Sequence, residues 1–462
     1  MSPLPGAAQN HLQNHLQNDL QSRTQATAQS RPQVVLIYKF LPHYRKRMFE
    51  LTHRLLAARG IDFTIWVGDH SGSAHAARKD CVELPFAHAM PTVRMPFLRR
   101  DLFLHLPPPN RPRPDVVVCE QAIKVPLNFW FALMARVRRH RFAWWGHGRN
   151  FQNDSPWGVE AVKKLTTRWA SWWISYNGLT DRVLRDDLHV AETRIWSIDN
   201  AIDTALLAEQ VDTQRARGRS LIEQEQCCRP SRLRIIFCGG LHPAKNVAVL
   251  LEAFPLLQRT IPDAQLIIIG DGADRGLVES HAAANPGIRL VGFAQGQVKA
   301  AWLAIGDVFV CPGMVGLNIL DAFAASLPFL TVAIPTHSPE IHYLVPGRNG
   351  VVVDPTAPAI AQGLATLATT DRAPLIAAAR ATARHYTCQR MAARFSAAMI
   401  LAARRPRFGA RSRRRDPHAA PLVPVADAVR STPVTVAPSR RDVPRPTPVA
   451  PPLRGDATSI CA

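Results

Sequence analysis

The chain has 462 residues and a formal net charge of +21, with 47% hydrophobic and 20% charged residues. This length exceeds what one compact core accommodates, so we expect two domains. No uncharged apolar run approaches the roughly 18 residues of a membrane-spanning helix, which argues against a chain that crosses the bilayer. The eight cysteines lack the paired spacing of a disulfide scaffold or a zinc site. These features together predict a cytoplasmic protein with reduced thiols.

The two ends of the chain differ in composition from its middle. Residues 1–30 repeat Gln, Asn, His and Leu and lack the apolar stretch of a secretory signal. Residues 403–462 carry twelve Arg against four Asp, are rich in Pro and show no apolar periodicity. We predict a disordered tail at each end. Whether the basic tail is a solvated extension or docks on lipid or a polymer remains open.

Residues 31–203 show the pattern of a first α/β domain. Residues 33–38 form a short apolar run typical of a strand buried on both faces, and residues 45–59 carry apolar positions at helical spacing. A strand pattern resumes at residues 62–67. Three further strands are predicted at residues 115–119, 142–145 and 172–175. Their separations leave room for crossover helices.

A second alternation follows a weakly patterned stretch, residues 204–231, which we interpret as a linker. Residues 232–384 begin with a strand at 233–238 and a helix at 246–259, and strand patterns recur at residues 265–269, 289–291, 308–311, 329–332 and 351–353. A last helix is expected at residues 385–402, and its packing back on the first domain is left open. The sequence therefore predicts an α/β protein of two doubly wound, Rossmann-like sheets facing across a cleft. In such sheets ligands bind beyond the carboxyl ends of the strands.

Two loops at such positions carry groups that suit a phosphate. The first contains Gly239 and Gly240, which allow close backbone approach, and Lys245 at the start of a helix. In the second, the amides of Gly316 and Leu317 precede a helix whose Asp321 suits the hydroxyls of a ribose. A tight turn with an exposed lysine and a first-turn aspartate placed by the helix dipole are the structural alternatives.

The order of these loops resembles the retaining glycosyltransferases of family 4, which share the GT-B fold. The matching pieces are Gly239-Gly240-Leu241 with Lys245-Asn246, Gly270-Asp271-Gly272, Leu320-Asp321-Ala322 and the stretch from His337 to Gly350. The resemblance covers residues 31–400. It implies that Gly239, Gly240, Lys245, Gly270, Phe293, Gly316, Leu317 and Asp321 bind the nucleotide-sugar donor.

The first domain adds Trp145-Gly146-His147-Gly148, which resembles a His-Gly element of the family. The resemblance implies that His147 lies near the transferred sugar and shares catalysis with Lys245. It also points to His43, Arg45 and Glu120 as residues that contact the acceptor. A structural histidine at 147 and an ordinary helix start at residues 42–45 are the alternatives.

Two positions depart from the family pattern. Gly240 stands where the family carries Arg, and Gly313 stands where the first Glu of its paired-Glu motif is expected. The loop around Gly313 has the form Pro-Gly-x-x-Gly-Leu, which resembles a variant subgroup. Catalytic competence is therefore less firmly predicted than the fold.

The resemblance implies sugar transfer from a nucleotide-diphosphate donor to a saccharide or lipid-linked saccharide, with retention, in cell-surface polysaccharide or glycan synthesis. No metal or other cofactor is expected, and no Asp-x-Asp motif lies near the predicted loops. A nucleotide-sugar epimerase of GT-B fold and a catalytically silent sugar-nucleotide-binding protein remain alternatives. Residues 128–145 and 163–173 mix aromatic and basic side chains. They fit crossover helices or a peripheral site on the inner face of an anionic membrane; no nucleic-acid partner is expected.

Overall fold

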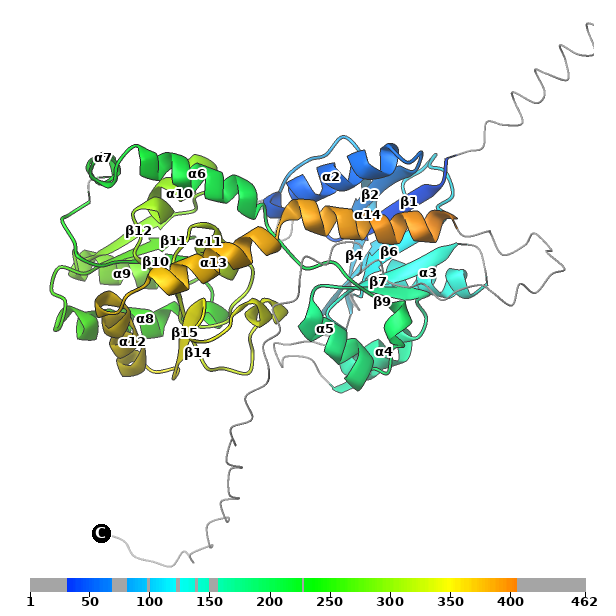
Figure 1. The fold of residues 1–462 in the computed structure, drawn as a ribbon. Coiled ribbons are helices and arrows are strands. Elements are labelled where there is room, and N and C mark those ends of the chain that lie inside the picture. The colour runs from blue at the N-terminus through cyan, green and yellow to red at the C-terminus, as the bar shows by residue number, and fades with distance from the viewer. Residues whose placement is uncertain are drawn as a thin grey trace, which may run out of the picture. The chain divides into compact units, whose positions relative to one another are not determined.

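The computed structural model describes residues 31–68, 81–97, 100–121, 125–137, 140–148, 157–226 and 228–404. The predicted tails, residues 1–30 and nearly all of residues 403–462, lie outside the described residues. Within them, two parallel sheets are each covered by helices on both faces (Figure 1). The prediction of an α/β fold with two Rossmann-like sheets is confirmed.

The first sheet has seven parallel strands in the order β3-β2-β1-β6-β7-β8-β9. They are β1 (Gln33–Tyr38), β2 (Asp62–Gly68), β3 (Ala87–Met90), β6 (Val116–Glu120), β7 (Arg141–Gly146), β8 (Trp172–Ser175) and β9 (Ile195–Ser197). The helices after these strands are α2 (Lys46–Ala57), α3 (Pro126–Arg136), α4 (Trp157–Thr167) and α5 (Gly178–Arg182). The strand order reverses at β1, which places the ends of β1 and β6 at the topological switch point.

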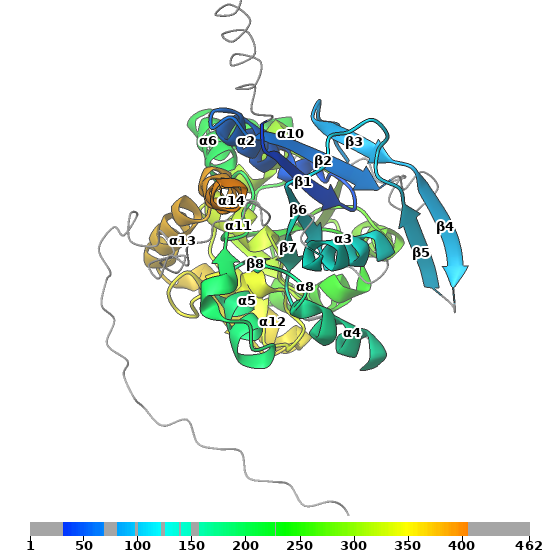
Figure 2. The same cartoon turned by 90° about the vertical axis from the view of Figure 1, so that its right-hand side faces the viewer.

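Side chains of the first sheet alternate between two apolar clusters. Val34 and Leu36 of β1 point to the face that α2 covers, whereas Val35 and Ile37 point to the opposite face. On that opposite face, side chains of α3 and Trp144 of β7 join the same cluster. Figure 2 shows α3 and α4 together on this side. The pattern explains the continuous apolar runs, because strands covered on both faces have no side exposed to water.

Some strands of this domain are missing from the sequence prediction. Besides β3 and β9, these are β4 (Thr92–Phe97) and β5 (Arg100–His105), which pair antiparallel as a separate hairpin. Arg94, Pro96 and Arg100 interrupt the apolar pattern of the hairpin. Strands at the edge of a sheet or in a two-stranded sheet need no continuous apolar run, and the sequence signal of these strands is therefore weak.

The second sheet has six parallel strands in the order β12-β11-β10-β13-β14-β15. They are β10 (Arg234–Cys238), β11 (Gln265–Ile269), β12 (Ile288–Gly292), β13 (Val308–Cys311), β14 (Phe329–Val332) and β15 (Gly350–Val353). One face packs on α8 (Val247–Gln258) and α12 (Ala357–Thr369). The other packs on α10 (Gly296–Ala304), α11 (Asn318–Ala324) and α13 (Ala373–His385). The remaining helix, α9 (Arg275–Ala284), follows β11.

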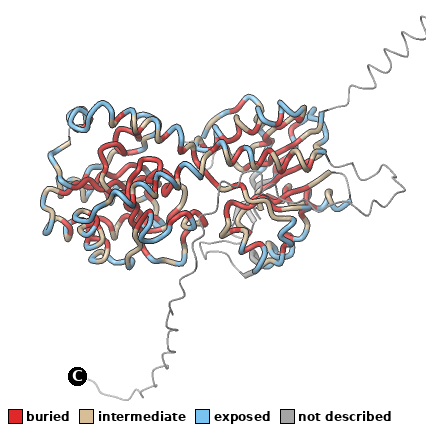
Figure 3. The backbone as a smooth tube through the Cα atoms, in the orientation of Figure 1, coloured by how far each residue is buried: buried red, intermediate tan, exposed pale blue. Residues whose placement is uncertain are grey.

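The stretch interpreted as a linker, residues 204–231, is mostly helical. It contains α6 (Thr204–Ala216) and α7 (Arg219–Glu225), and α6 packs on α10 and α11. The last helix, α14 (Cys388–Arg404), lies against α2 of the first sheet. Trp196 Nε1 donates to the Arg394 carbonyl of α14 at 2.9 Å. Buried residues concentrate on the strands and the inner helix faces (Figure 3).

Candidate functional site

The predicted site residues lie at the carboxyl ends of parallel strands in both domains. Glu120 ends β6 and His147 follows β7, while Lys245, Phe293 and the 313–317 loop follow strands β10, β12 and β13. Because strands of one parallel sheet end at the same edge, each set of loops is gathered on one side of its sheet.

The loop after β10 is held by backbone contacts to the loop after β11. Gly239 N–H donates to the Ile269 carbonyl at 3.0 Å, and Leu241 N–H donates to the Asp271 carbonyl at 2.9 Å. A Cβ added at Gly270 would lie 1.9 Å from the Gly239 carbonyl oxygen. Only glycine allows this approach, which accounts for the Gly-Asp-Gly element and fixes the position of the loop that leads to Lys245.

Lys245 is buried between two loops. Its side chain is 7% exposed, and Nζ donates to the Met314 carbonyl at 2.6 Å. The Met314 amide donates in turn to the Ala244 carbonyl at 2.8 Å. The Lys245 ammonium is thus fixed against the loop after β13. Lys245 is therefore not the exposed lysine of a tight turn, which was the alternative interpretation of the sequence. A catalytic role for Lys245 stays a prediction.

Gly313 lies where a larger residue has no room. A Cβ at this position would be 2.5 Å from the Ala244 carbonyl oxygen and 2.6 Å from the Lys245 carbonyl carbon. Both are backbone atoms, which cannot rotate aside as a side chain does. The glycine therefore allows the loops around Lys245 and Met314 to touch, and the glutamate of the resembled family does not fit this backbone.

The Gly316 amide has a hydrogen-bond partner within the protein, contrary to what we predicted from the sequence. We expected the Gly316 and Leu317 amides to be free to face a phosphate, but Gly316 N–H donates to Asn318 Oδ1 at 3.0 Å. The expectation is therefore wrong for the Gly316 amide, because the short side chain of Asn318 folds back onto the turn that precedes α11. Donor contacts through Gly240 and Leu317 stay predictions.

Asp321 has a basic partner that sequence reasoning missed. Lys299 Nζ of α10 lies 2.7 Å from Asp321 Oδ1, and both side chains are largely buried. Burial, the largest single effect, lowers the pKa of Lys299, but the charge and hydrogen bond of Asp321 together with the nearby Cys238 outweigh it, and the pKa is raised. A ribose contact of Asp321 stays a prediction. The pair was not visible in the sequence because its members are 22 residues apart on different helices.

An aromatic contact joins two predicted site residues of different domains. The ring of His43, in the short 3₁₀ turn His43–Arg45, meets the ring of Phe293 edge to face at a centroid distance of 6.0 Å. Phe293 is 45% exposed. The residue predicted to meet the acceptor and the residue predicted to meet the donor are therefore neighbours.

His147 stacks on Tyr176, with ring centroids 4.2 Å apart. Burial, followed by the positive charges of Lys163 and Arg45, lowers the pKa of His147 to about 3. The imidazole is therefore neutral at physiological pH, a state in which one ring nitrogen donates and the other accepts. Such a group recognises hydroxyls without carrying charge.

Arg45 lies in a buried network rather than at an open surface. Its side chain is 2% exposed, and its guanidinium donates to Asn200 Oδ1 at 2.5 Å. Asn200 Nδ2 donates to Glu340 Oε1 at 2.5 Å, and Tyr343 OH donates to the Asn200 carbonyl at 2.9 Å. The network links the turn His43–Arg45, the segment after β9 and the turn Pro339–Tyr343. An acceptor contact of Arg45 stays a prediction, but both terminal nitrogens of its guanidinium already have protein partners.

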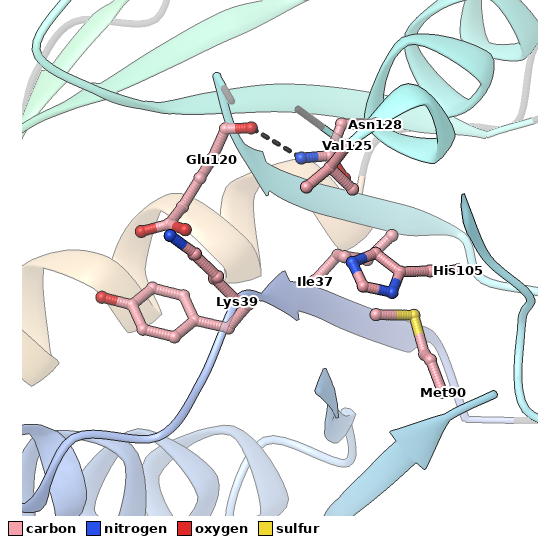
Figure 4. A pocket seen from close by; sticks show the side chains of 8 residues that line it. Ile37, Lys39, Met90, His105, Glu120, Val125 and Asn128 are labelled. Carbon is pink, nitrogen blue, oxygen red and sulfur yellow. Dashed lines mark hydrogen bonds between the residues drawn. The ribbon is translucent and has the colours of Figure 1, made fainter. Parts of the chain in front are cut away.

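Glu120 lines a small pocket at the ends of β1 and β6, where Figure 4 shows its carboxylate and the Lys39 ammonium pointing toward one another. Burial raises the pKa of Glu120, whereas the charges of Lys39 and Arg45 act in the opposite direction. Asn128 Nδ2 donates to the Glu120 carbonyl at 2.8 Å. A role of Glu120 in acceptor binding stays a prediction.

Metal ligands and membrane-spanning segments were also sought in the described residues. There, no three His, Cys, Asp or Glu side chains are grouped so that they could hold a metal ion. Over the same residues, no helix has the length and apolar character needed to cross a bilayer.

Comparison with known proteins finds a family similarity in the second domain. Residues 232–370 match the family model described as glycosyl transferases group 1. The matched range contains Lys245 and the loop after β13. The donor loops recognised in the sequence all lie inside the matched range.

Curated relatives cover only part of the chain. A GDP-mannose-dependent alpha-(1-6)-phosphatidylinositol dimannoside mannosyltransferase of Mycobacterium tuberculosis is 27% identical over 194 residues, which are 41% of this chain and 50% of the relative. An alpha-monoglucosyldiacylglycerol synthase of Acholeplasma laidlawii is 32% identical over 101 residues, 21% of this chain and 25% of the relative. The chain thus spans half or less of the length of these two relatives.

Solved structures show the same fold over most of the chain. A glycosyltransferase from Rickettsia africae has a TM-score of 0.59 at 14% identity, over 81% of this chain and 99% of that one. The Anabaena protein HepE in complex with UDP-glucose has a TM-score of 0.55 at 13% identity, over 80% and 99% of the two chains. These similarities establish the GT-B fold.

Proposed function

We propose that this protein is a glycosyltransferase that moves a hexose from a nucleotide-diphosphate donor to a lipid-linked or saccharide acceptor, with retention and without a metal ion. The observation that carries the proposal is the position of Lys245. Its ammonium lies buried between the loops after β10 and β13, inside the domain that matches group 1 glycosyl transferases.

The reaction breaks the bond between the anomeric carbon and the diphosphate and forms a bond from that carbon to an acceptor hydroxyl oxygen. Negative charge develops on the leaving phosphate, and a cation that is already in place stabilises this charge with little reorganisation. Lys245 fits this role because its Nζ is held by the Met314 carbonyl at 2.6 Å. The proton of the acceptor hydroxyl passes to the departing phosphate.

His147 takes a different part in the proposed reaction. With its pKa lowered to about 3 by burial and nearby cations, its ring has no proton to release as an acid near pH 7. It serves instead as a neutral hydrogen-bonding partner for a sugar hydroxyl. In this proposal the proton therefore passes directly from the acceptor hydroxyl to the departing phosphate, and His147 does not carry it.

The donor is proposed to be GDP-mannose or a UDP-hexose. One relative is named as GDP-mannose-dependent, and one structural neighbour was solved with UDP-glucose. A thermal-shift screen of GDP- and UDP-sugars separates these donors, because a ligand that binds only the native state raises its stability by mass action.

A lipid acceptor is favoured by one surface of the first domain, which we call the α3–α4 face. Trp130 and Leu133 of α3 are 54% and 43% exposed, and Leu165 of α4 is 67% exposed. Exposed basic residues accompany them: Arg136 on α3, Lys164 on α4 and Arg168 directly after α4. Aromatic and apolar side chains with adjacent cations suit the interface of an anionic membrane. Relatives named for phosphatidylinositol mannoside and diacylglycerol glycosylation agree with this proposal.

The central test replaces Lys245 with Met, which keeps the apolar stem and removes the charge. Loss of a transition-state charge stabiliser costs about 3–4 kcal/mol, so turnover with the donor found by the screen should fall about 100- to 1000-fold. Lys46→Met is the matched control, because Lys46 is exposed on α2. Equal turnover of the two variants would contradict the proposed role. Nucleotide-sugar binding without transfer or hydrolysis in the wild type would favour a silent binding protein, and epimerised donor without acceptor would favour an epimerase.

The membrane proposal has its own test. Sedimentation with vesicles containing phosphatidylinositol should retain the wild type, and the double substitution Trp130→Ser and Leu165→Ser should weaken retention about tenfold or more. Leu277→Ser, at an exposed position of α9, serves as the control. Retention that is unchanged in the double variant, or that is equal on zwitterionic vesicles, would argue against docking through the α3–α4 face.

A further inference from the structure

The loop after β13 is attached to the segment after β14 by two hydrogen bonds. Val315 N–H donates to His337 Nδ1 at 3.0 Å, and Ser338 N–H donates to the Val315 carbonyl at 3.0 Å. His337 is 8% exposed. The family resemblance described above implies no function for His337 or Ser338. Residues 314–316 are thus held by Lys245 on one side and by residues 337–338 on the other.

The hydrogen bonds of His337 require a single protonation state. A backbone amide donates only, so Nδ1 must accept from Val315 and carries no hydrogen. Nε2 lies 2.8 Å from the Val332 carbonyl, which accepts only, so the hydrogen of the ring lies on Nε2. Burial and the charge of Lys245 also lower the pKa of His337, which favours this neutral ring. The histidine therefore acts as a rigid spacer between β14 and the loop.

The result of this arrangement is a small space over Gly316 that two polar side chains border. A methyl group added at Gly316 would lie 3.8 Å from Lys245 Nζ and 4.0 Å from Ser338 Oγ. Both polar atoms therefore lie within about 4 Å of one point. Nζ uses one of its three hydrogens on the Met314 carbonyl, which leaves two for a ligand.

The chemistry of this space suits an anion. A cation and a hydroxyl both donate hydrogen bonds, whereas recognition of sugar hydroxyls usually includes a carboxylate. The nearby carboxylates are engaged elsewhere, since Asp321 pairs with Lys299 and Glu340 accepts from Asn200. A phosphate oxygen is the group that two such donors bind best.

We propose that Ser338 is a donor-binding residue whose hydroxyl hydrogen-bonds the same phosphate that Lys245 neutralises, and that His337 is the positioning residue that holds Ser338 and Gly316 in place. The inference rests on the proposed function, because it names a further contact in the same donor site. Gly316 is part of the assignment, since any larger residue there fills the space for the phosphate.

Titration calorimetry with GDP, UDP and inorganic pyrophosphate tests Ser338 and Gly316. Ser338→Ala should weaken binding of the nucleotide that the wild type binds about 10- to 100-fold, and Ser338→Thr, which keeps the hydroxyl, should recover most of it. Gly316→Ala should weaken binding to a similar extent without lowering Tm, because the added methyl meets nothing closer than 3.8 Å. Gly276→Ala, where an added methyl has no neighbour within 4 Å, is the control.

The positioning role of His337 is tested by two variants. His337→Asn keeps an acceptor near Val315 N–H and should retain nucleotide affinity within about threefold, whereas His337→Leu should lose about tenfold or more. The loss should appear in KM more than in kcat, since an altered fold would lower the amount of active protein and hence kcat. If Ser338→Ala and Gly316→Ala bind nucleotide as the wild type does while Lys245→Met does not, the assignment of Ser338 fails and the proposed function stands. A wild type that binds none of the three probes overturns both.

Discussion

The substitution Gly313→Ala tests how the site tolerates its departure from the family pattern. The added Cβ would meet the Ala244 carbonyl oxygen at 2.5 Å and the Lys245 carbonyl carbon at 2.6 Å. Ordinary separations of such atoms are about 3.5 Å, so the two loops would have to separate by roughly 1 Å. Overpacking of this kind costs about 1–3 kcal/mol, and loss of the hydrogen bond from Met314 N–H to the Ala244 carbonyl adds about 1 kcal/mol. We expect the variant to be about 2–4 kcal/mol less stable.

Urea denaturation followed by circular dichroism measures this difference. Gly276→Ala should lie within about 0.5 kcal/mol of the wild type, because Gly276 is exposed and nothing surrounds its added methyl. Gly316→Ala, only three residues from Gly313, should also leave stability unchanged. If Gly313→Ala is as stable as these two variants, the explanation for the missing glutamate at this position is wrong.

Three further predictions concern buried polar groups. His147 should keep a neutral imidazole down to pH 5 in an NMR titration, and a titration midpoint near pH 6.5 would contradict this. Because the folded-state pKa of His147 is lowered, its contribution to stability should be complete above pH 6.5 and lost as the pH falls toward 3. Lys299→Met leaves Asp321 with an unpaired carboxylate and should cost about 2–3 kcal/mol in urea denaturation, a loss that the double change with Asp321→Leu should largely reverse. Asn200→Ala removes one partner of the buried Arg45 guanidinium and should cost about 2–4 kcal/mol by the same measurement, whereas equal stability would show that another group replaces it.

Sequence patterns located most of the strands for a simple physical reason. Strands such as β1 and β11 are buried on both faces, so each is a continuous apolar run between turn residues. The sequence prediction missed β3, β9 and the hairpin of β4 and β5. It also missed the helical nature of residues 204–231, because α6 contributes few buried positions and has a weak apolar stripe.

The donor loops were recognisable in the sequence because their glycines, Lys245 and Asp321 lie in short motifs whose spacing along the chain reflects the loop geometry. Their partners lie far away along the chain, and only folding brings them together. Lys299 reaches Asp321 from a different helix, and His337 meets Val315 from the loop after the next strand. No local pattern encodes such pairs.

By itself, the sequence determined which strands are buried on both faces, how many sheets they form and where the donor loops fall, since these properties depend on local apolar periodicity and on glycines at turns. Tertiary structure decided which groups in those loops are available for chemistry. It engaged the Gly316 amide with Asn318, buried Arg45 beside Asn200 and left Gly313 no room for a side chain. The physical reason is that burial and hydrogen-bond partners are properties of the packed molecule, set by residues that are distant along the chain.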